Sequence, residues 1–156
     1  MSDEFFHQKL QITSISKPFE KQARQLILNG LEERFGFLDS SFNPDLADIM
    51  QHYSQPGFIF LTGIYNNEVV CTGALTEEEP GVGRIQRMSV KKSCRRIGIA
   101  GSMLQELEAR ANKAGYKQVV LETNNEWHSA IEFYRKRGYR LNWKDEECSH
   151  FLKILD

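Results

Sequence analysis

The sequence Met88-Ser-Val-Lys-Lys-Ser-Cys-Arg-Arg-Ile-Gly-Ile-Ala100 joins the end of an expected strand to the start of an expected helix through a basic turn. The first backbone N–H groups of a helix have no partner inside it, and the helix dipole places partial positive charge there. Gly98 allows a ligand to approach the backbone closely, and Ala100 keeps the first helical turn narrow. Arg95 and Arg96 add positive charge at the same place. These features predict a site for phosphate groups that is built largely from backbone.

Two common phosphate-binding motifs do not account for this turn. A Walker loop would require Gly-Lys followed by Ser or Thr, and this sequence is absent. A dinucleotide fingerprint would place its glycines after the strand, whereas Gly81-Val-Gly83 precedes it. For Gly98 taken alone, the remaining alternative is a glycine that only relieves a tight turn between strand and helix.

The charge of the chain is balanced overall and uneven locally. Lys and Arg number 20 and Asp and Glu 21, which gives a formal net charge of −1. A local basic patch on such a protein favours a small polyanion over a long nucleic acid, although a solvated basic face remains the simpler alternative. Aromatic residues are not interleaved with the patch, as a nucleic-acid stacking platform would require. The patch consists of Arg84, Arg87, Lys91, Lys92, Arg95 and Arg96, with no acid among them.

Composition indicates an ordinary globular protein, because 40% of the 156 residues are hydrophobic and 26% are charged. A chain of this length buries about 70% of its unfolded surface, so we expect one domain over residues 1–156. No apolar run approaches the ~20 residues that span a bilayer. The N-terminus lacks a basic and then apolar signal pattern, so we expect a cytoplasmic protein without a membrane partner.

The cysteines predict neither disulfides nor a metal centre. Cys71, Cys94 and Cys148 are odd in number and widely spaced. The chain contains no Cys-x-x-Cys and no His-Glu-x-x-His motif. We therefore expect reduced thiols and no bound metal.

Apolar periodicity predicts the order β-α-α-β-β-β-α-β-α-β-β and a mixed α/β fold class. The strand–helix–strand unit in the second half requires a right-handed crossover. An acidic loop is expected at 77–83, between the third and fourth strands. The strands are expected at 6–15, 58–65, 68–75, 84–90, 118–122, 139–143 and 149–155, and the helices at 17–35, from 43 onward, at 97–114 and at 127–137.

Two elements of the sequence resemble those of the GNAT superfamily of acyl-CoA-dependent N-acetyltransferases. Arg95-x-x-Gly98-x-Ala100 matches the signature Gln/Arg-x-x-Gly-x-Gly/Ala, and Met88-Ser89-Val90 resembles the strand before it. Ala130-Ile-Glu-Phe-Tyr-Arg-Lys-Arg-Gly-Tyr139 resembles the later element Ala-x-x-Phe-Tyr-x-x-x-Gly-Phe/Tyr. The matched region spans 84–141, and two elements in the family's order are more specific than either alone.

The resemblance implies a three-layer fold, with a mixed, mostly antiparallel sheet splayed at its central strands and helices on both faces. It also implies acetyl transfer from acetyl-CoA, a co-substrate, to a primary amine by direct attack in a ternary complex, without a metal. Backbone groups of Met88 and Val90 would pair with the pantetheine arm. Amides from Arg96 to Gly101 would hold the pyrophosphate, with Arg95 nearby. The implied acetyl-CoA site comprises Met88, Ser89, Val90, Arg95, Arg96, Ile97, Gly98, Ile99, Ala100 and Gly101.

The resemblance places Tyr134 beside the thioester sulfur. A neutral phenol, with a reference pKa of ~10, can protonate a thiolate whose pKa is ~8.5, although Tyr134 could also be only a packing aromatic. Glu122, at the carboxyl end of its expected strand, is the first choice for the base that deprotonates the amine. His128 and the acids at 77–79 are weaker candidates, and a structural carboxylate is the competing interpretation of Glu122.

Three positions depart from the family pattern. Arg96 stands where many members have glycine, and Lys92 where proline is frequent. Trp127 replaces a customary asparagine, for which Asn124 or Asn125 could stand in.

The resemblance leaves the acceptor open. Residues 35–55 and 76–83 would face it, and their acids are compatible with a cationic small-molecule or peptide amine. A homodimer through the closing strands is allowed. One rival is an acyl-CoA-binding sensor or interaction module without turnover, against which the intact Tyr134 speaks. The other is a nucleic-acid-binding domain, which the pattern of the basic patch disfavours.

Overall fold

The computed structural model describes residues 6, 9–36 and 43–156. In this part of the chain seven strands form one sheet, in the order β1-β2-β3-β4-β5-β7-β6. Neighbouring strands are antiparallel except β4 and β5, which are parallel. The strands are β1 (Gln11–Ser14), β2 (Ile59–Tyr65), β3 (Glu68–Glu79), β4 (Val82–Val90), β5 (Gln118–Asn124), β6 (Arg140–Lys144) and β7 (Cys148–Ile154).

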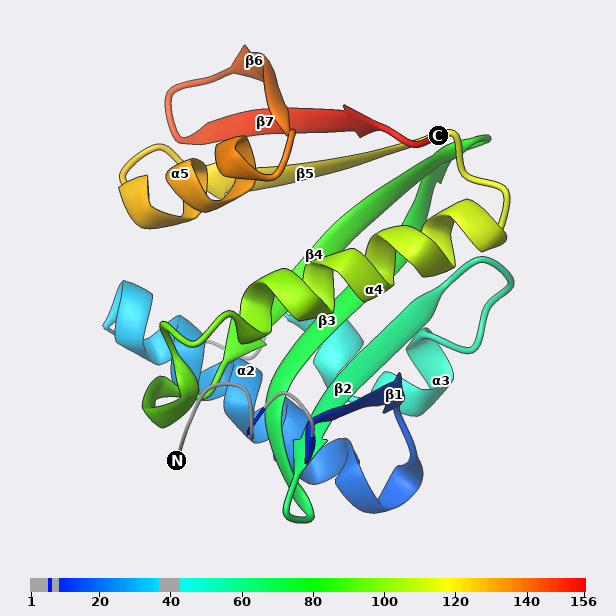
Figure 1. Cartoon of the computed structure of the whole chain (residues 1–156), viewed down its shortest axis with the longest axis vertical. Helices are drawn as coiled ribbons and strands as arrows, with labels where there is room; N and C mark the ends of the chain where they lie inside the picture. Colours follow the sequence, from blue (N-terminus) through cyan, green and yellow to red (C-terminus); the bar gives the residue numbers. More distant parts are fainter. Residues whose placement is uncertain (1–5, 7–8, 37–42) are drawn as a thin grey trace.

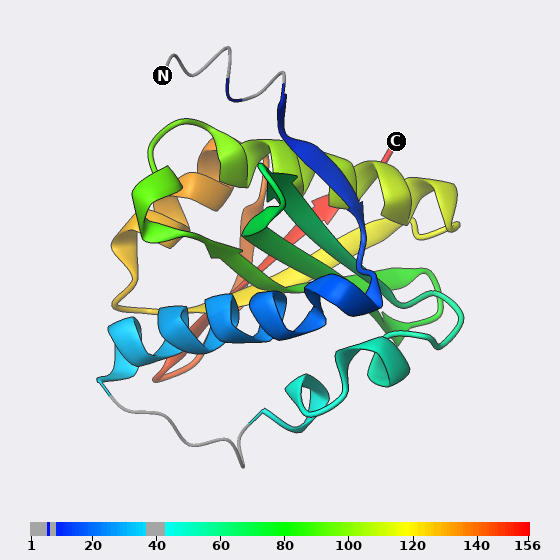
Figure 2. The same cartoon turned by 90° about the horizontal axis from the view of Figure 1, so that it is seen from below.

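Helices cover both faces of the sheet (Figure 1). Figure 2 shows α4 on one side of the sheet and α2 with α3 on the other. This arrangement confirms the expected three-layer, mixed α/β fold with a mostly antiparallel sheet. The helices are α2 (Glu20–Phe35), α3 (Ile49–His52), α4 (Ile99–Lys113) and α5 (His128–Lys136), and the 3-10 turns are η1 (Lys17–Phe19), η3 (Pro44–Leu46) and η4 (Lys92–Cys94).

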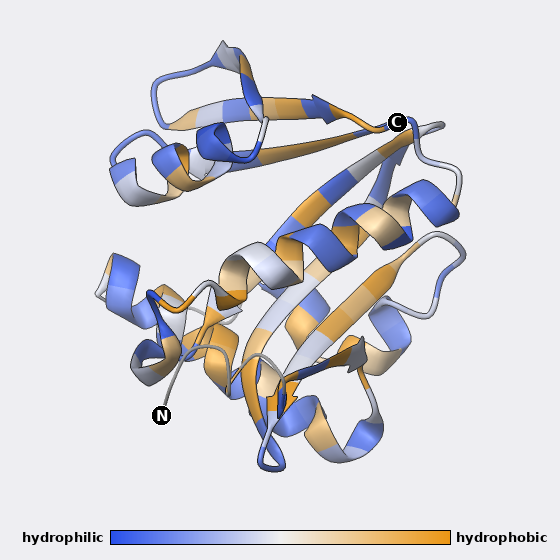
Figure 3. Cartoon of the chain, viewed as in Figure 1, coloured by the Kyte–Doolittle hydropathy of each residue, from blue (hydrophilic) through white to orange (hydrophobic). Residues whose placement is uncertain are grey.

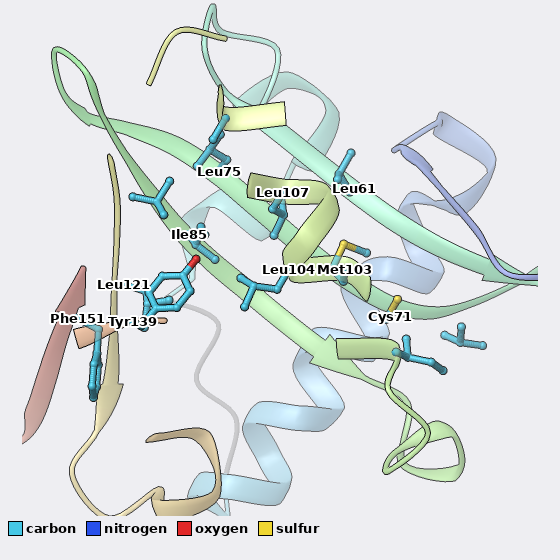
Figure 4. Close-up of a cluster of buried hydrophobic side chains, with 14 of the residues drawn as sticks. Leu61, Cys71, Leu75, Ile85, Met103, Leu104, Leu107, Leu121, Tyr139 and Phe151 are labelled. Carbon is cyan, nitrogen blue, oxygen red and sulfur yellow. The ribbon is translucent and has the colours of Figure 1, made fainter. Parts of the chain in front are cut away.

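A hydrophobic core lies on each face of the sheet. On one face α4 packs its stripe of Ile99, Met103, Leu107 and Ala111, which are almost completely buried, against the strands. Figure 4 shows Met103 and Leu107 among the side chains of this cluster. Each fully buried Ile, Leu or Met side chain contributes roughly 1.5–3 kcal/mol. On the other face α2 and α3 cover a second cluster of Ala23, Ile27, Leu46, Ile49, Tyr53, Phe60, Val69 and Ala74. In Figure 3, most residues within β2 and β5 are accordingly hydrophobic, whereas hydrophilic and apolar residues alternate along α4.

The β2–β3 hairpin forms where the sequence predicts it. Asn66 and Asn67 both adopt positive φ, 49° and 61°. Two such residues are what a tight hairpin turn of matching twist requires, and asparagine tolerates this conformation better than most residues.

Two sequence predictions of local structure are wrong. The first strand covers only Gln11–Ser14, since Phe6 and Lys9 are helical and the Leu10 N–H donates to the Phe6 carbonyl at 2.9 Å. The ring of Phe6 stacks on Tyr65, with centroids 4.2 Å apart, so its hydrophobicity serves packing and not a strand. The expected acidic loop at 77–83 is a hairpin, because Gly81 (φ 83°) permits a tight turn after Pro80 and β3 and β4 stay paired up to Glu79 and Val82.

The parallel strands β4 and β5 pair at one end only. Their register covers Val82↔Gln118, Gly83↔Val119 and Arg84↔Val120. Beyond these pairs the two strands separate toward their carboxyl ends (Figure 1). A bulge contributes, because the β3–β4 register shifts between Thr72 and Ala74 and Arg87 on β4 has a φ of 58°. Ligands of open α/β sheets bind beyond the carboxyl ends of such strands.

Candidate active site

The turn from β4 into α4 leaves the helix N-terminus uncapped. Gly98, the N-cap residue, has a φ of 86°, and no side chain of the described residues caps the helix. The backbone amides of the first turn therefore have no intrahelical acceptor and face outward with the positive end of the dipole. Arg96 also adopts a left-handed conformation, with a φ of 68°. Such alternation of left-handed residues turns successive N–H groups toward one concave side, as in anion-binding nests.

The two arginines of this turn differ in their surroundings. Arg95 donates from Nη1 and Nη2 to the two carboxylate oxygens of Glu33 on α2, at 2.7 and 3.0 Å. Its Nε donates to the Val90 carbonyl at 3.1 Å. The hydrogen bonds from Arg95 hold the pKa of Glu33 below its usual value. Arg96 is exposed. Arg95 thus ties the turn to α2, and Arg96 is the arginine directed to solvent.

A pocket of about 420 Å³ lies beside the first turn of α4. Its lining residues are Gly98, Gly101, Ser102, Leu104, Gln105, Glu108, Arg137 and Lys153. A Cβ on Gly101 would lie 3.0 Å from Nη2 of Arg137, so glycine is what allows the guanidinium to rest against this turn. Sequence reasoning did not identify Arg137, because the close approach of α5 to α4 leaves no local pattern.

A polar network joins α4 to the C-terminal strands beside this pocket. Glu108 on α4 accepts from the Tyr139 hydroxyl at 2.7 Å and from Lys153 Nζ at 3.0 Å. Lys153 also donates to the Arg137 carbonyl at 2.9 Å. The network fixes β7 and the end of α5 relative to α4.

Tyr134 projects from α5 into an aromatic cluster. Its ring lies 5.0 Å from that of Phe133 and 5.6 Å from that of Tyr139, between centroids. Burial raises the pKa of Tyr134 to about 12. Among the residues that the structure describes, none forms a hydrogen bond with its hydroxyl. The side chain is therefore neutral at physiological pH and keeps its O–H available for a ligand.

A second hydroxyl without a partner lies at the open end of β5. Thr123 is 5% exposed, and its Oγ1 has no hydrogen-bond partner among the described residues. A buried hydroxyl without a partner is costly.

Glu122 lies on the opposite face of β5 from Thr123, since successive side chains of a strand alternate. Its neighbours Leu121 and Thr123 are buried, whereas the Glu122 side chain is 51% exposed. Directly across from it on β7 is His150, whose Nδ1 is 3.5 Å from Glu122 Oε2. The other ring nitrogen, Nε2, is 3.2 Å from Asp145 Oδ2. Trp143 stacks on the imidazole, with centroids 3.7 Å apart and planes at 5°.

Trp127 bridges α5 and α2. The Arg34 guanidinium lies 4.2 Å from the centre of a Trp127 ring, and the Phe35 ring is 5.4 Å from it. The candidates to replace the customary asparagine are occupied. Asn125 donates to the Asp145 carbonyl and accepts from Ser149, and Asn124 accepts from the Glu126 N–H.

The other base candidates are less favourably placed. His128 is exposed at the start of α5. Glu77 and Glu79 lie on the β3–β4 hairpin, at the end where β4 and β5 are paired and not where they separate. The expectation that 76–83 faces an acceptor therefore does not agree with the strand register. Glu78 accepts two hydrogen bonds from Arg84 at 2.6 and 3.0 Å.

Part of the expected acceptor segment 35–55 lies outside the described residues, at 37–42. The residues that follow are held against the β4 bulge. Arg87 donates to both oxygens of Asp45, at 3.0 and 2.6 Å, and to Asn43 Oδ1 at 2.9 Å. Tyr53 donates its hydroxyl proton to Asp45 at 2.7 Å. The Arg87 charge is thereby balanced within the protein.

Neither a metal centre nor a membrane span is found in the part of the chain that the structure describes. Across residues 6, 9–36 and 43–156, no three His, Cys, Asp or Glu side chains are grouped so as to hold a metal ion. Within the same residues, no helix has the length and apolarity that crossing a bilayer requires.

Comparison with known proteins agrees with this geometry. The IAA acetyltransferase of Azospirillum brasilense is 31% identical over 78% of this chain and 79% of its own. A GNAT-family acetyltransferase of Staphylococcus aureus Mu50 superposes with a TM-score of 0.84 at 20% identity, over 94% of this chain and 99% of its own. The PaiA N-acetyltransferase of Thermoplasma acidophilum, solved in complex with coenzyme A, superposes with a TM-score of 0.80 at 15% identity, over 93% and 98%.

The family model for acetyltransferases of the GNAT family matches residues 24–139, which include the β4–α4 turn and α5. The resemblance drawn from the sequence is thereby confirmed. The chain belongs to the acetyltransferase (GNAT) family and is an acyltransferase.

Proposed function

We propose that this protein transfers the acetyl group of acetyl-CoA to a primary amine of a small molecule or peptide, by direct attack of the amine in a ternary complex. The observation that carries the proposal is the separation of β4 from β5 immediately beside the uncapped N-terminus of α4. The end of this opening at the N-terminus of α4 suits the diphosphate of acetyl-CoA, and the unpaired part of β4 suits its extended pantetheine arm. The PaiA structure with coenzyme A supports the same ligand class.

Residues of the turn and of β4 hold acetyl-CoA in this proposal. The amides from Arg96 to Gly101 bind the pyrophosphate, with the exposed Arg96 side chain adding charge. The backbone of Met88, on the part of β4 that does not pair with β5, bonds to the pantetheine arm. The Val90 carbonyl already accepts a hydrogen bond from Arg95. Val90 therefore contributes to the acetyl-CoA site by fixing the end of β4 relative to the turn.

Tyr134 acts as the general acid. As the new C–N bond forms and the C–S bond breaks, the phenol donates its proton to the leaving sulfur. Because burial raises its pKa to about 12, the proton is present at every physiological pH. The hydroxyl is then reprotonated by one of the two protons that the amine nitrogen loses, so that one proton per turnover ends on the CoA thiol.

Glu122 acts as the general base for the other proton. A primary ammonium, with a pKa near ~10.4, must lose a proton before its nitrogen can attack. Glu122 is two residues beyond the last β5 residue paired with β4, and its carboxylate lies on the face of the sheet opposite to α4. An amine that enters from this face meets the carboxylate before it reaches the opening. The same negative charge favours a cationic acceptor.

Two measurements test the proposal and its rival. Thermal-shift titrations compare CoA, acetyl-CoA and a single-stranded oligonucleotide, and we expect stabilisation by the first two alone. Thiol release from acetyl-CoA is then followed with a panel of polyamines, aminoglycosides, lysine and peptides. Amine-dependent thiol release supports the enzyme. Stabilisation by acetyl-CoA without release by any amine supports a non-catalytic acyl-CoA sensor instead, and stabilisation by the oligonucleotide alone contradicts both.

A further inference from the structure

We propose that His150 is a positioning residue for Glu122 and accepts its proton, so that Glu122, His150 and Asp145 form a relay that leads the amine's proton to solvent. The inference rests on the proposed function, because it assumes that Glu122 takes a proton from the acceptor amine. It assigns a role to three side chains on β5, β7 and the turn between β6 and β7.

The strand register brings these groups together. Glu122 on β5 and His150 on β7 are direct cross-strand partners, and Trp143 on β6 is the partner of His150 on its other side. The row therefore runs across three adjacent strands on one face of the sheet. Side chains directly opposite each other on neighbouring strands have Cβ atoms about 4.5–5.5 Å apart, so the strand register keeps Glu122 and His150 close together.

The imidazole is fixed between two carboxylates. Nδ1 is 3.5 Å from Glu122 Oε2, and Nε2 is 3.2 Å from Asp145 Oδ2. The His150 side chain is 14% exposed. Trp143 covers one face of the imidazole ring, with 3.7 Å between the ring centroids. Asp145 is itself held in place, because its Oδ1 accepts from the backbone N–H of Glu147 and of Cys148 at 2.8 and 2.7 Å.

These contacts select the tautomer that a relay needs. Asp145 keeps a pKa below its usual value, chiefly through the two backbone hydrogen bonds and then through His150, so it is an anion that accepts from Nε2–H. In the neutral ring the lone pair is then on Nδ1, which faces Glu122. A proton taken by Glu122 from the ammonium moves to Nδ1, and the imidazolium is stabilised by Asp145 until it releases a proton to water. The proton count closes, since Glu122 and His150 both return to their starting forms.

The other charged groups around the row do not replace this path. On β4, Arg84 interacts electrostatically with Glu122, and its guanidinium donates to Glu78 at 2.6 Å. On β7, burial and then the negative charges of Glu122, Asp145 and Glu147 raise the pKa of the Cys148 thiol. A thiol that stays protonated is not a proton acceptor at neutral pH. Among the described residues, the His150 imidazole is the base that lies within ion-pairing distance of the Glu122 carboxylate.

The test compares the wild type with His150→Ala and His150→Phe in steady-state kinetics with an accepted amine. His150→Phe keeps an aromatic ring to stack on Trp143 and removes both nitrogens, so it separates proton transfer from packing. We expect kcat to fall about tenfold in each variant while KM for acetyl-CoA stays within a factor of about two. Added imidazole should restore most of the kcat of His150→Ala. Lys113→Ala, an exposed position in the last turn of α4, is the control and should keep wild-type kinetics.

A double mutant completes the experiment. If Glu122 and His150 act on one path, then Glu122→Gln with His150→Ala loses little more activity than Glu122→Gln alone. Full activity of His150→Phe, or additive losses without rescue by imidazole, would overturn the relay and leave the proposed function standing. Absence of amine-dependent turnover in the wild type would overturn the proposed function and the relay with it.

Discussion

Arg95 and Glu33 form a two-pronged ion pair, at 2.7 and 3.0 Å, that fastens the β4–α4 turn to α2. The pair joins residues 62 positions apart. Arg96, the next residue, points to solvent from a left-handed backbone. The two adjacent arginines of the basic patch therefore differ in their contacts: Arg95 ties the turn to α2, whereas the proposed function gives Arg96 the task of presenting charge to the phosphates.

Replacement of the two arginines should separate these tasks. Arg96→Gly relieves a left-handed conformation that costs an L residue about 1–2 kcal/mol, so we expect thermal stability to be kept or raised. The same change removes a charge-assisted contact and should weaken CoA binding about tenfold, with a flatter salt dependence. Thermal unfolding and calorimetric CoA titrations measure the two effects.

Arg95→Ala should lower the thermal stability, in contrast to Arg96→Gly. It removes the link to Glu33 and the bond to the Val90 carbonyl, so we expect a lower Tm and a loss of CoA affinity that Glu33→Ala reproduces. Equal losses of CoA affinity in Arg95→Ala and Arg96→Gly, with Glu33→Ala unaffected, would show that both arginines contact phosphate.

Tyr134→Phe keeps the aromatic packing and removes only the hydroxyl. Because no described residue bonds to that hydroxyl, its loss should leave Tm nearly unchanged. We expect kcat to fall ~10²-fold or more, while KM for acetyl-CoA changes little. A kcat within a factor of about two of the wild type, with chemistry rate-limiting, would make Tyr134 a packing residue.

Stability should fall in alkaline solution. Burial raises the pKa of Tyr134 to about 12 and raises those of Tyr53 and Tyr139 as well. Below pH ~10 the phenols are protonated in the folded and unfolded chains, so they add no pH dependence. Above that pH only the unfolded chain ionises, and Tyr134 alone lowers the free energy of unfolding by roughly 2–3 kcal/mol by pH ~12. Urea unfolding between pH 9 and 12 measures this loss, which Tyr134→Phe should reduce.

Glu122→Gln tests the base. It keeps size and hydrogen bonding and removes basicity, so kcat/KM should fall most at acidic pH and recover as rising pH deprotonates the amine in solution. A pH–rate profile from about pH 6 to about pH 9 measures the effect. A uniform decrease over that range would mean that Glu122 only binds the ammonium form, and no decrease would remove it from the mechanism.

Local pattern was enough to predict much of this fold. The stripe Ile99, Met103, Leu107 and Ala111 specifies α4, and the asparagine pair at 66 and 67 specifies a hairpin, because both signals lie within a few residues of chain. Phe6 misled the prediction of β1, since its ring packs on Tyr65 and an apolar residue before a strand is indistinguishable from one within it. The acids at 77–79 suggested a loop although exposed strand residues are polar as well.

The site was predictable only where it is local. The turn that ends at Gly98 could be identified because strand, turn and helix follow each other in sequence. The pairing of Glu122 with His150 depends on the β5–β7 register, and that of Arg95 with Glu33 depends on the packing of α2. Neither leaves a spacing that a sequence pattern can show.

The central claim is that an acetyl group passes from acetyl-CoA to an amine on this protein. Mass spectrometry of reactions with the amine panel tests it most directly, with the released CoA thiol quantified in the same samples. We expect at least one acetylated amine, formed in a one-to-one ratio with CoA and reduced ~10²-fold in Tyr134→Phe. Saturable acetyl-CoA binding without an acetylated product from any amine would contradict the claim.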